Sequence, residues 1–288
     1  METPMVPNGG FVKLLSHMGE DSEICSTARV STGSSGGDES QDRQLIRYLM
    51  RHRHTSPFEF AQYVFHVRAP ILVARQWVRH RMASWSEVSG RYAPVDTGYA
   101  PPGPWRGQAK HNRQGSEGEV QYETGLFDGL GSGSHANTAE QVAFEEYEQR
   151  IKAGVAREQA RGCLPLSTWT EWRWSIDLHN LLHFLSLRLA PDAQQEIRAY
   201  AHVIAHQVSV WNPMVYEAWC DYRRDAVTLS ALDIKVLSAW PLDPQQDRQP
   251  GEMTDEHKQL CVRVGMSTGE AREHAEKRRA LARETTSK

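Results

Sequence analysis

The sequence contains little cysteine and no long apolar run, and each shortage excludes a class of protein. Its four cysteines are widely separated and include no CxxC pair: Cys25, Cys163, Cys220 and Cys261. This spacing is typical of free thiols in a reducing compartment rather than of a disulfide framework. No apolar stretch is long enough to cross a bilayer, and the first residues show no secretory pattern. We therefore expect a cytoplasmic protein that does not associate with membranes.

A strong excess of either charge is also missing. The chain has 33 Lys and Arg residues against 36 Asp and Glu residues, which gives a formal net charge of -3. A field this weak does not favour a nucleic acid or a membrane surface as a bulk partner. The 288 residues, 39% of them hydrophobic and 24% charged, are typical of a soluble globular protein with a large core.

Against this nearly neutral background, residues 79–92 concentrate cationic side chains. The run Arg-His-Arg-Met-Ala-Ser-Trp-Ser-Glu-Val-Ser-Gly-Arg-Tyr holds three arginines, one histidine, one carboxylate and three serines. Clustered guanidinium groups repel one another and are usually kept where an anion binds between them, because each one grips a phosphate with paired hydrogen bonds. A solvated basic strand is the alternative. The apolar residues 70–78 before the run place part of it near the core, which favours a site for a phosphorylated small molecule.

Hydrophobic periodicity predicts a mixed fold. Residues 59–68 alternate in polarity and place four apolar side chains on one face: Ala61, Tyr63, Phe65 and Val67. Residues 166–175 alternate again and contain three large aromatic residues: Trp169, Trp172 and Trp174. Helices are expected over about 41–53, from Pro70, behind a capping box at Asn137 and Glu140, behind Asp177, and over about 192–210 and 268–284. The fold class is therefore α+β, a modest antiparallel sheet packed by helices.

Composition also divides the chain. The small polar residues of 31–42 predict a mobile loop. Residues 93–136, rich in Gly, Pro and Ser, predict a long excursion with short ordered pieces, lying over the ligand or a neighbouring subunit. We expect one catalytic domain over residues 1–240 and a polar C-terminal extension over 241–288.

Residues 79–92 resemble the signature of the flavin-dependent thymidylate synthases. That pattern is Arg-His-Arg, two variable residues, Ser, a variable residue, Asn or Ser, Glu or Gln, a variable residue, Ser, a variable residue, Arg-Tyr. Five further blocks match in family order: 28–31, 54–59, 69–76, 160–165 and 184–188. The resemblance covers roughly residues 10–225. It implies the family's fold, FAD as cofactor, and reductive C5 methylation of a uridine monophosphate, by default dUMP to dTMP, with methylenetetrahydrofolate and NADPH as co-substrates. It also implies a homotetramer with active sites at subunit interfaces, and no metal.

The resemblance also assigns site residues. It implies that FAD contacts Ser31, His54, Ser56, Arg79, His80, Arg81, Glu87, Asp177, His179 and His183. It implies that the nucleotide contacts Gln76, Arg79, Glu87, Ser89, Gly90, Arg91, Arg161 and Arg188. Arg188 is expected to be the catalytic residue, which faces the N3/carbonyl edge of the pyrimidine and stabilises developing negative charge. Without the resemblance, His54 and Arg161 fit ordinary surface residues, and Arg188 fits a charge at a helix C-terminus.

Several positions depart from the family pattern and leave alternatives open. Phe60 and Asp192 stand where histidine is common, Pro191 precedes Asp192, and Asp177 replaces a frequent asparagine. One alternative is UMP methylation, as in a relative from polyoxin-type nucleoside antibiotic biosynthesis. Another is a catalytically silent flavin- or nucleotide-binding protein. A further alternative is an RNA-binding module. The near-neutral charge and the absence of an RNA-binding motif count against it.

Overall fold

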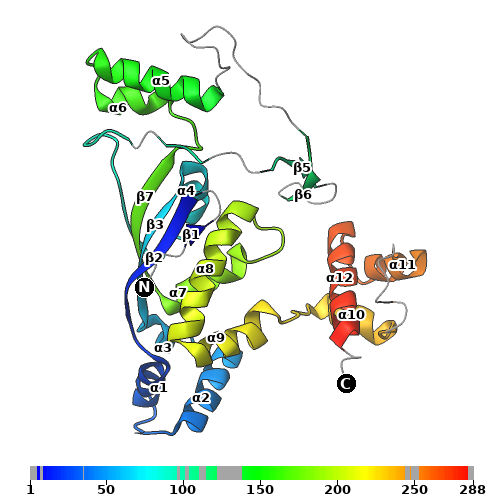
Figure 1. Cartoon of the computed structure of the whole chain (residues 1–288). Coiled ribbons are helices and arrows are strands. Elements are labelled where there is room, and N and C mark those ends of the chain that lie inside the picture. Colours follow the sequence, from blue (N-terminus) through cyan, green and yellow to red (C-terminus); the bar gives the residue numbers. More distant parts are fainter. Residues whose placement is uncertain are drawn as a thin grey trace. The chain divides into compact units, whose positions relative to one another are not determined.

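The computed structural model describes residues 5–6, 9–34, 36–95, 98–100, 104–109, 115–121, 138–243, 247 and 253–284 (Figure 1). The chain divides into two compact units, Met1–Arg223 and Arg224–Lys288. The boundary therefore falls before residue 240, the predicted end of the first domain. The reason is that helix α10 (Ala231–Ala239) packs its Val236 against Cys261, Met266 and Ala271 of the second unit.

The first unit is built on a five-stranded antiparallel sheet, which confirms the predicted α+β class. The strands lie in the order β1-β2-β3-β7-β4. Their bounds are β1 Met5–Val6, β2 Gly10–Met18, β3 Gln62–Pro70, β4 Ser84–Glu87 and β7 Trp169–Asp177. β3 and β7 are central, so their pairing sets the positions of everything attached to their ends.

The predicted alternation of β3 is confirmed. The four apolar residues predicted to share its inner face are fully buried: Ala61, Tyr63, Phe65 and Val67. Phe65 pairs with Trp174 across the sheet, and Val67 pairs with Trp172. The strand begins three residues later than predicted because Pro57 helps to open a short helix, α3 (Ser56–Glu59), directly before it.

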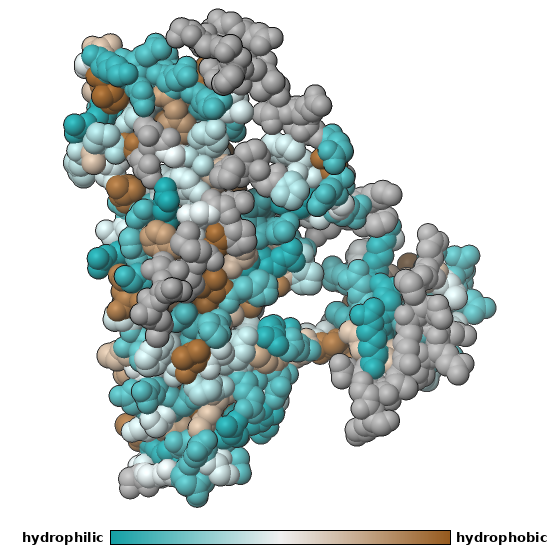
Figure 2. Space-filling view, viewed as in Figure 1, coloured by the Kyte–Doolittle hydropathy of each residue, from teal (hydrophilic) through white to brown (hydrophobic). Residues whose placement is uncertain are grey.

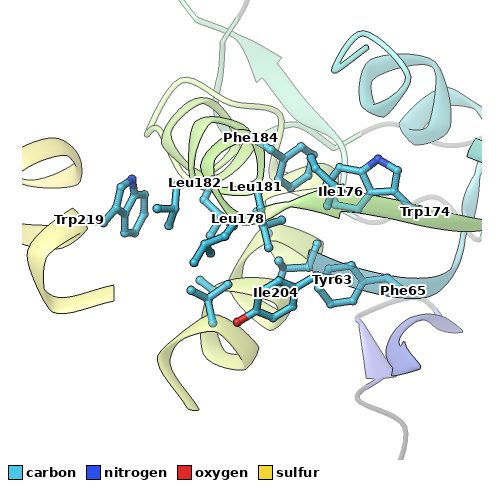
Figure 3. Packing of buried hydrophobic residues seen from close by; sticks show 14 of the residues in the cluster. Tyr63, Phe65, Trp174, Ile176, Leu178, Leu181, Leu182, Phe184, Ile204 and Trp219 are labelled. Carbon is cyan, nitrogen blue, oxygen red and sulfur yellow. The ribbon is translucent and has the colours of Figure 1, made fainter. Parts of the chain in front are cut away.

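Helices α7 (Leu178–Arg188) and α8 (Gln195–Trp211) supply the apolar side chains that cover this inner face (Figure 3). As predicted, Asp177 caps α7, since its Oδ1 accepts a hydrogen bond from the Asn180 backbone N–H at 2.9 Å. Pro70 stands at the N-cap of α4 (Ile71–Trp77), one position before the predicted first turn. Helices α1 (Asp21–Val30), α2 (Glu39–His52) and α9 (Pro213–Trp219) pack together at one end of the unit.

Two predicted boundaries were wrong. The last residues of the predicted loop 31–42 belong to α2 instead. Asp38 caps that helix and accepts a hydrogen bond from Gln41 N–H at 2.8 Å. Helix α5 (Ala139–Lys152) has Thr138 as its N-cap, whose Oγ1 accepts from Gln141 N–H at 3.4 Å. The predicted cap, Asn137, lies outside the described residues.

The described parts of 93–136 contain short ordered pieces, as predicted. Tyr99 forms an isolated bridge with Thr168, and β5 (Arg106–Gln108) pairs with β6 (Ser116–Glu119). The face of the molecule in Figure 2 mixes hydrophilic and hydrophobic side chains in both units. Among the described residues, no helix has the length and apolar character that crossing a membrane requires.

The second unit contains α10, α11 (Asp255–Arg263) and α12 (Thr268–Glu284), and α12 matches the predicted helix over 268–284. Several of its buried charged groups form ion pairs. Asp233 binds His274 Nδ1 at 2.7 Å and Lys277 Nζ at 2.7 Å, while Arg278 binds Asp247 at 2.8 Å.

Candidate functional site

A pocket of about 220 Å³ lies where the ends of α2 and α3 meet α7 and α9. Five apolar side chains form its floor: Leu49, Met50, Phe58, Leu182 and Trp219. Five basic side chains also line it, together with Thr55 and Ser186: Arg53, His54, His179, His183 and Arg223. Asp and Glu are absent from the described residues that line it. An apolar floor beside basic groups suits a ring-bearing anion.

Two of these basic residues stand where they do because of how α2 ends. Arg53 adopts the left-handed conformation, with φ 60° and ψ 34°, and is the C-cap of the helix. The His54 backbone N–H then donates to the Leu49 carbonyl at 3.0 Å, which closes the last turn. This conformation usually requires glycine and costs another residue about 1 kcal/mol. The turn directs the chain from α2 into α3 and places His54 beside the pocket.

Arg188, the last residue of α7, forms a second part of the site. Its Nε donates to His80 Nε2 at 3.0 Å, and its guanidinium donates to the Gln76 backbone carbonyl at 3.2 Å. The Gln76 side chain is itself held by a hydrogen bond to Gln194. The structure therefore brings together three predicted residues from α4, the turn after it and α7.

His80 joins this part to the pocket. Its ring lies 4.8 Å from the Phe184 ring and 6.1 Å from the His183 ring, measured between centroids. Burial, and then the positive charges of Arg188 and His183, lower the pKa of His80 to about 4. His80 is therefore neutral at pH 7, and because Nε2 accepts from Arg188, its proton resides on Nδ1.

A separate group forms around the loop that follows β4. A Cβ atom at Gly90 would lie 2.8 Å from Val95 Cγ2 and 3.3 Å from Arg161 Cδ, so glycine allows this close packing. Arg91 forms an ion pair with Glu158 at 3.0 Å, and Ser89 Oγ accepts from the Arg91 backbone N–H at 3.3 Å. Arg161 begins the short helix η2 (Arg161–Cys163) directly after α6 (Arg157–Ala160).

Glu87 connects β4 to β7. Its carboxylate accepts a hydrogen bond from Thr170 Oγ1 at 2.6 Å and another from Trp85 Nε1 at 3.2 Å. Within the part of the chain that the structure describes, no hydrogen bond or ion pair joins Glu87 to Arg188 or to Arg161. The predicted nucleotide-binding residues thus fall into separate groups within one copy of the chain.

Other predicted residues lie on the surface. Arg79 and Arg81 are exposed, and neither forms an ion pair with another described residue. Ser31 closes α1 by donating from its Oγ to the Ala28 carbonyl at 2.8 Å, and Ser56 is exposed at the start of α3. Asp177, predicted to contact flavin, uses both carboxylate oxygens to bind Asn180, at 2.9 and 2.7 Å.

Two departures from the family pattern lie outside the pocket. Phe60 is 64% exposed at the end of α3, and Asp192 is exposed after α7. Neither residue lines the pocket among the described residues. Their side chains therefore do not alter its floor or its basic wall.

Sequence reasoning missed Arg53 and Arg223. Arg53 stands inside the recognisable run Arg51-His52-Arg53-His54, whose neighbouring histidine was predicted, so a signal existed. Arg223 had none, because it lies far along the chain from α2 and only the packing of α9 against α2 brings it to the pocket.

A larger cavity of about 610 Å³ lies elsewhere in the first unit, lined in part by Leu72, Trp169 and Tyr200. None of the predicted site residues lines it among those described. Its Arg106 is neutralised by Glu196, whose two carboxylate oxygens both accept from Arg106 Nη2, at 2.7 and 2.9 Å. Size alone therefore does not identify the site, and the uncompensated cations favour the smaller pocket.

Comparison with known proteins places these residues in a family context. Residues 13–214 match the family model described as thymidylate synthase complementing protein. The chain is 46% identical over 240 residues to the flavin-dependent thymidylate synthase of a Thermus thermophilus strain, covering 82% of this chain and 86% of the relative. It is 41% identical over 240 residues to the flavin-dependent thymidylate synthase of Wolbachia pipientis, covering 82% of each.

Solved structures show the same similarity. The UMP/dUMP methylase PolB from Streptomyces cacaoi, bound with 5-Br dUMP, matches with a TM-score of 0.65 and 31% identity. The match covers 77% of this chain and 99% of that one. A second structure of PolB, bound with 5-Br UMP, matches with a TM-score of 0.63 and 30% identity.

Proposed function

The chain belongs to the thymidylate synthase complementing protein family, and from this membership we propose that it catalyses the flavin-dependent methylation of a uridine monophosphate at C5. dUMP is the default substrate, since relatives 46% and 41% identical are named flavin-dependent thymidylate synthases. In this proposal methylenetetrahydrofolate supplies the one-carbon unit and NADPH supplies the reducing equivalents.

The pocket beside α2 and α7 fits a flavin by its chemistry. Its apolar floor suits a ring system, and its basic wall without a described acid suits the phosphates of FAD. When bound, FAD supplies the hydride-transfer chemistry that reductive methylation requires. We propose that these residues contact it: Ser31, His54, Ser56, Arg79, His80, Arg81, Glu87, Asp177, His179 and His183.

The observation that carries the proposal is the way Arg188 is held. Neutral His80 accepts a hydrogen bond from Arg188 Nε, and the Gln76 carbonyl accepts a second from the guanidinium. A guanidinium has five N–H donors, so this leaves others for a ligand. We propose that they face the N3/carbonyl edge of the pyrimidine, where a fixed cation stabilises the negative charge that develops on the ring as C5 becomes nucleophilic. His80 acts here as a positioning residue.

We assign nucleotide binding to both groups of polar residues: Gln76, Arg79, Glu87, Ser89, Gly90, Arg91, Arg161 and Arg188. The described contacts hold Arg91 and Arg161 around Gly90, and they hold Gln76 around Arg188, but they do not join the two groups. We propose that the groups meet between copies of the chain, in a homotetramer whose active sites lie at subunit interfaces.

The cytoplasm is the compartment that we propose. All four cysteines are free, and free thiols persist in a reducing environment. Burial raises the pKa of the Cys25 thiol to about 12, so this cysteine is unreactive at neutral pH.

The test is purification followed by a tritium-release assay. The protein is expected to carry flavin absorbance and to release tritium from C5-labelled dUMP when NADPH and methylenetetrahydrofolate are both present. Omission of either co-substrate is the matched control. A protein that binds flavin and releases no tritium from any uridine nucleotide would instead be a silent homologue.

A second candidate substrate is UMP. The observation that favours it is the similarity to PolB, which is described as a UMP/dUMP methylase and was crystallised with both 5-Br dUMP and 5-Br UMP. The same assay with C5-labelled UMP distinguishes the two substrates by their ratio of kcat/KM.

A further inference from the structure

We propose that Arg53 and Arg223 form an anion-binding pair that holds a phosphate group of an adenine dinucleotide in the pocket beside α2. Neither residue belongs to the sequence motifs that imply flavin or nucleotide contacts. The inference rests on the proposed function for the presence of such a dinucleotide, which is either the flavin or the nicotinamide co-substrate.

One backbone carbonyl accepts hydrogen bonds from both residues. The Met50 carbonyl accepts a hydrogen bond from the Arg53 backbone N–H at 3.4 Å and another from the Arg223 guanidinium at 2.7 Å. Both residues line the same pocket. Burial, and then the nearby charge of Arg53, lower the pKa of Arg223.

Two other arginines of α2, Arg43 and Arg47, are neutralised, whereas Arg53 and Arg223 are not. Arg47 binds Asp221 at 2.6 Å and Glu217 at 3.2 Å, and Arg43 also binds Glu217. Within the described residues, neither Arg53 nor Arg223 forms an ion pair. Two cationic side chains that line one pocket without a described carboxylate partner are available to an anion.

A purely structural role explains Arg223 but not Arg53. A guanidinium at the C-terminal end of α2 satisfies a free carbonyl and opposes the negative end of the helix dipole. Arg53, however, occupies a left-handed position that glycine would fill at lower energy. Its side chain makes no described hydrogen bond that would offset this cost. A residue kept there at a cost to stability points to a role in binding.

The surroundings favour a phosphate of a dinucleotide. His54, His179 and His183 line the same pocket as the arginine pair, so several donors converge on one volume of about 220 Å³. The pyrophosphate of a dinucleotide offers more non-bridging acceptor oxygens to such a set than a single carboxylate offers. Apolar residues, which include the buried Phe58 and Trp219, also line the pocket beside the basic groups.

The experiment uses the full-length holoenzyme with Arg53→Gly and Arg223→Gln. Glycine keeps the left-handed turn, and glutamine retains a donor for the Met50 carbonyl, so both variants are expected to fold. Arg51→Gln is the matched control, because Arg51 is an exposed residue of the same helix that does not line the pocket. FAD affinity is measured by fluorescence titration at two ionic strengths, and flavin reduction by NADPH and NADH is measured by stopped flow.

Each substitution is expected to weaken the binding of one dinucleotide about tenfold and to reduce the salt dependence of that binding. Loss of FAD affinity identifies the flavin phosphates as the ligand. Loss of the preference for NADPH over NADH, with FAD affinity kept, identifies the phosphate of the nicotinamide dinucleotide. Melting temperatures should not fall, whereas the loss of a merely structural pair would lower them.

Unchanged binding of both dinucleotides, or a change confined to the KM for the folate, overturns the inference. If wild-type enzyme meanwhile binds flavin and releases tritium, the proposed function stands and only this inference fails. If wild-type protein binds no FAD and releases no tritium, the proposed function and the inference fail together.

Discussion

The two units of the chain arrange their charged side chains in opposite ways. In the second unit, Asp233 is 2% exposed and binds both His274 and Lys277, so each charge has a partner. In the first unit, Arg53, Arg188 and Arg223 line or adjoin the pocket without a carboxylate among the described residues that contact them. A buried charge of the first kind needs its partner for the fold to remain stable, while cations of the second kind, which solvent reaches, are available to a ligand. This contrast, rather than cavity size, separates the candidate site from the scaffold.

The largest effect should come from removing the fixed cation. Arg188→Ala is expected to lower kcat for tritium release by about a thousandfold, because loss of one fixed stabilising group typically costs this much. The melting temperature should change little, since the hydrogen bonds of the part-buried Arg188 side chain among the described residues go to His80 and the Gln76 carbonyl. Arg79→Ala should likewise abolish turnover. Wild-type rates in either variant would remove that residue from the mechanism.

Substitution of a paired charge in the second unit should lower the stability of that unit and leave catalysis unchanged. Asp233→Ala leaves His274 and Lys277 without their carboxylate and should lower the free energy of unfolding of the second unit by about 3 kcal/mol. Hydrogen exchange of α12 peptides measures this loss, and Glu256→Ala, on the exposed side of α11, is the control. A tritium-release rate that fell as steeply as stability would contradict the separation of the two units.

Hydrophobic patterns near each other in sequence predicted the scaffold well. The alternation of Ala61, Tyr63, Phe65 and Val67 identified β3, and the cap at Asp177 identified the start of α7. Local patterns of this kind are set by neighbours two to four residues away, which a sequence displays directly. The fold class followed from them.

The candidate site could be predicted only where a motif marked it. Residues 79–92 pointed to His80, whereas Arg223 has no local signal and reaches the pocket through packing of α9 against α2. The pairing of Arg188 with neutral His80 also depends on a contact between residues 108 positions apart. Such long-range contacts and their effects on pKa follow from the three-dimensional fold alone.

The pH dependence of stability tests the same contrast between the two units, beginning with His80 in the first unit. The pKa of His80 is about 4 in the folded chain and near 6.5 when unfolded, so the unfolded state binds the proton first as pH falls. Stability from neutral His80 is therefore complete above pH 6.5 and is lost on acidification. The loss should be about 1 kcal/mol between pH 6.5 and 5, because solvent screens part of the charge on this half-buried ring. His80→Gln should remove this slope in urea unfolding of the first unit. An unchanged slope would show that His80 does not titrate as the structure implies.

In the second unit, the stability that Asp233 contributes should not change with pH over the same range. Its hydrogen bonds to Lys277, Ser230 and His274 outweigh burial and hold its pKa well below the usual range. The stability that it contributes is present above pH 4 and is lost only as pH falls below that value. Between pH 6.5 and 5, unfolding of the second unit should therefore show no contribution from Asp233.

A last prediction tests whether Arg53 is kept for its charge at a backbone position that glycine would occupy at lower energy. Arg53→Gly should raise the free energy of unfolding of the first unit by about 1 kcal/mol, because glycine adopts the φ of 60° without the clash of a Cβ. Arg53→Ala removes the same charge but keeps the Cβ, so it should leave stability close to wild type. A gain in both variants would assign the effect to relief of repulsion with Arg223, since only the glycine variant relieves the backbone. A gain in glycine alone would show that the arginine is kept at a position where the fold itself favours another residue.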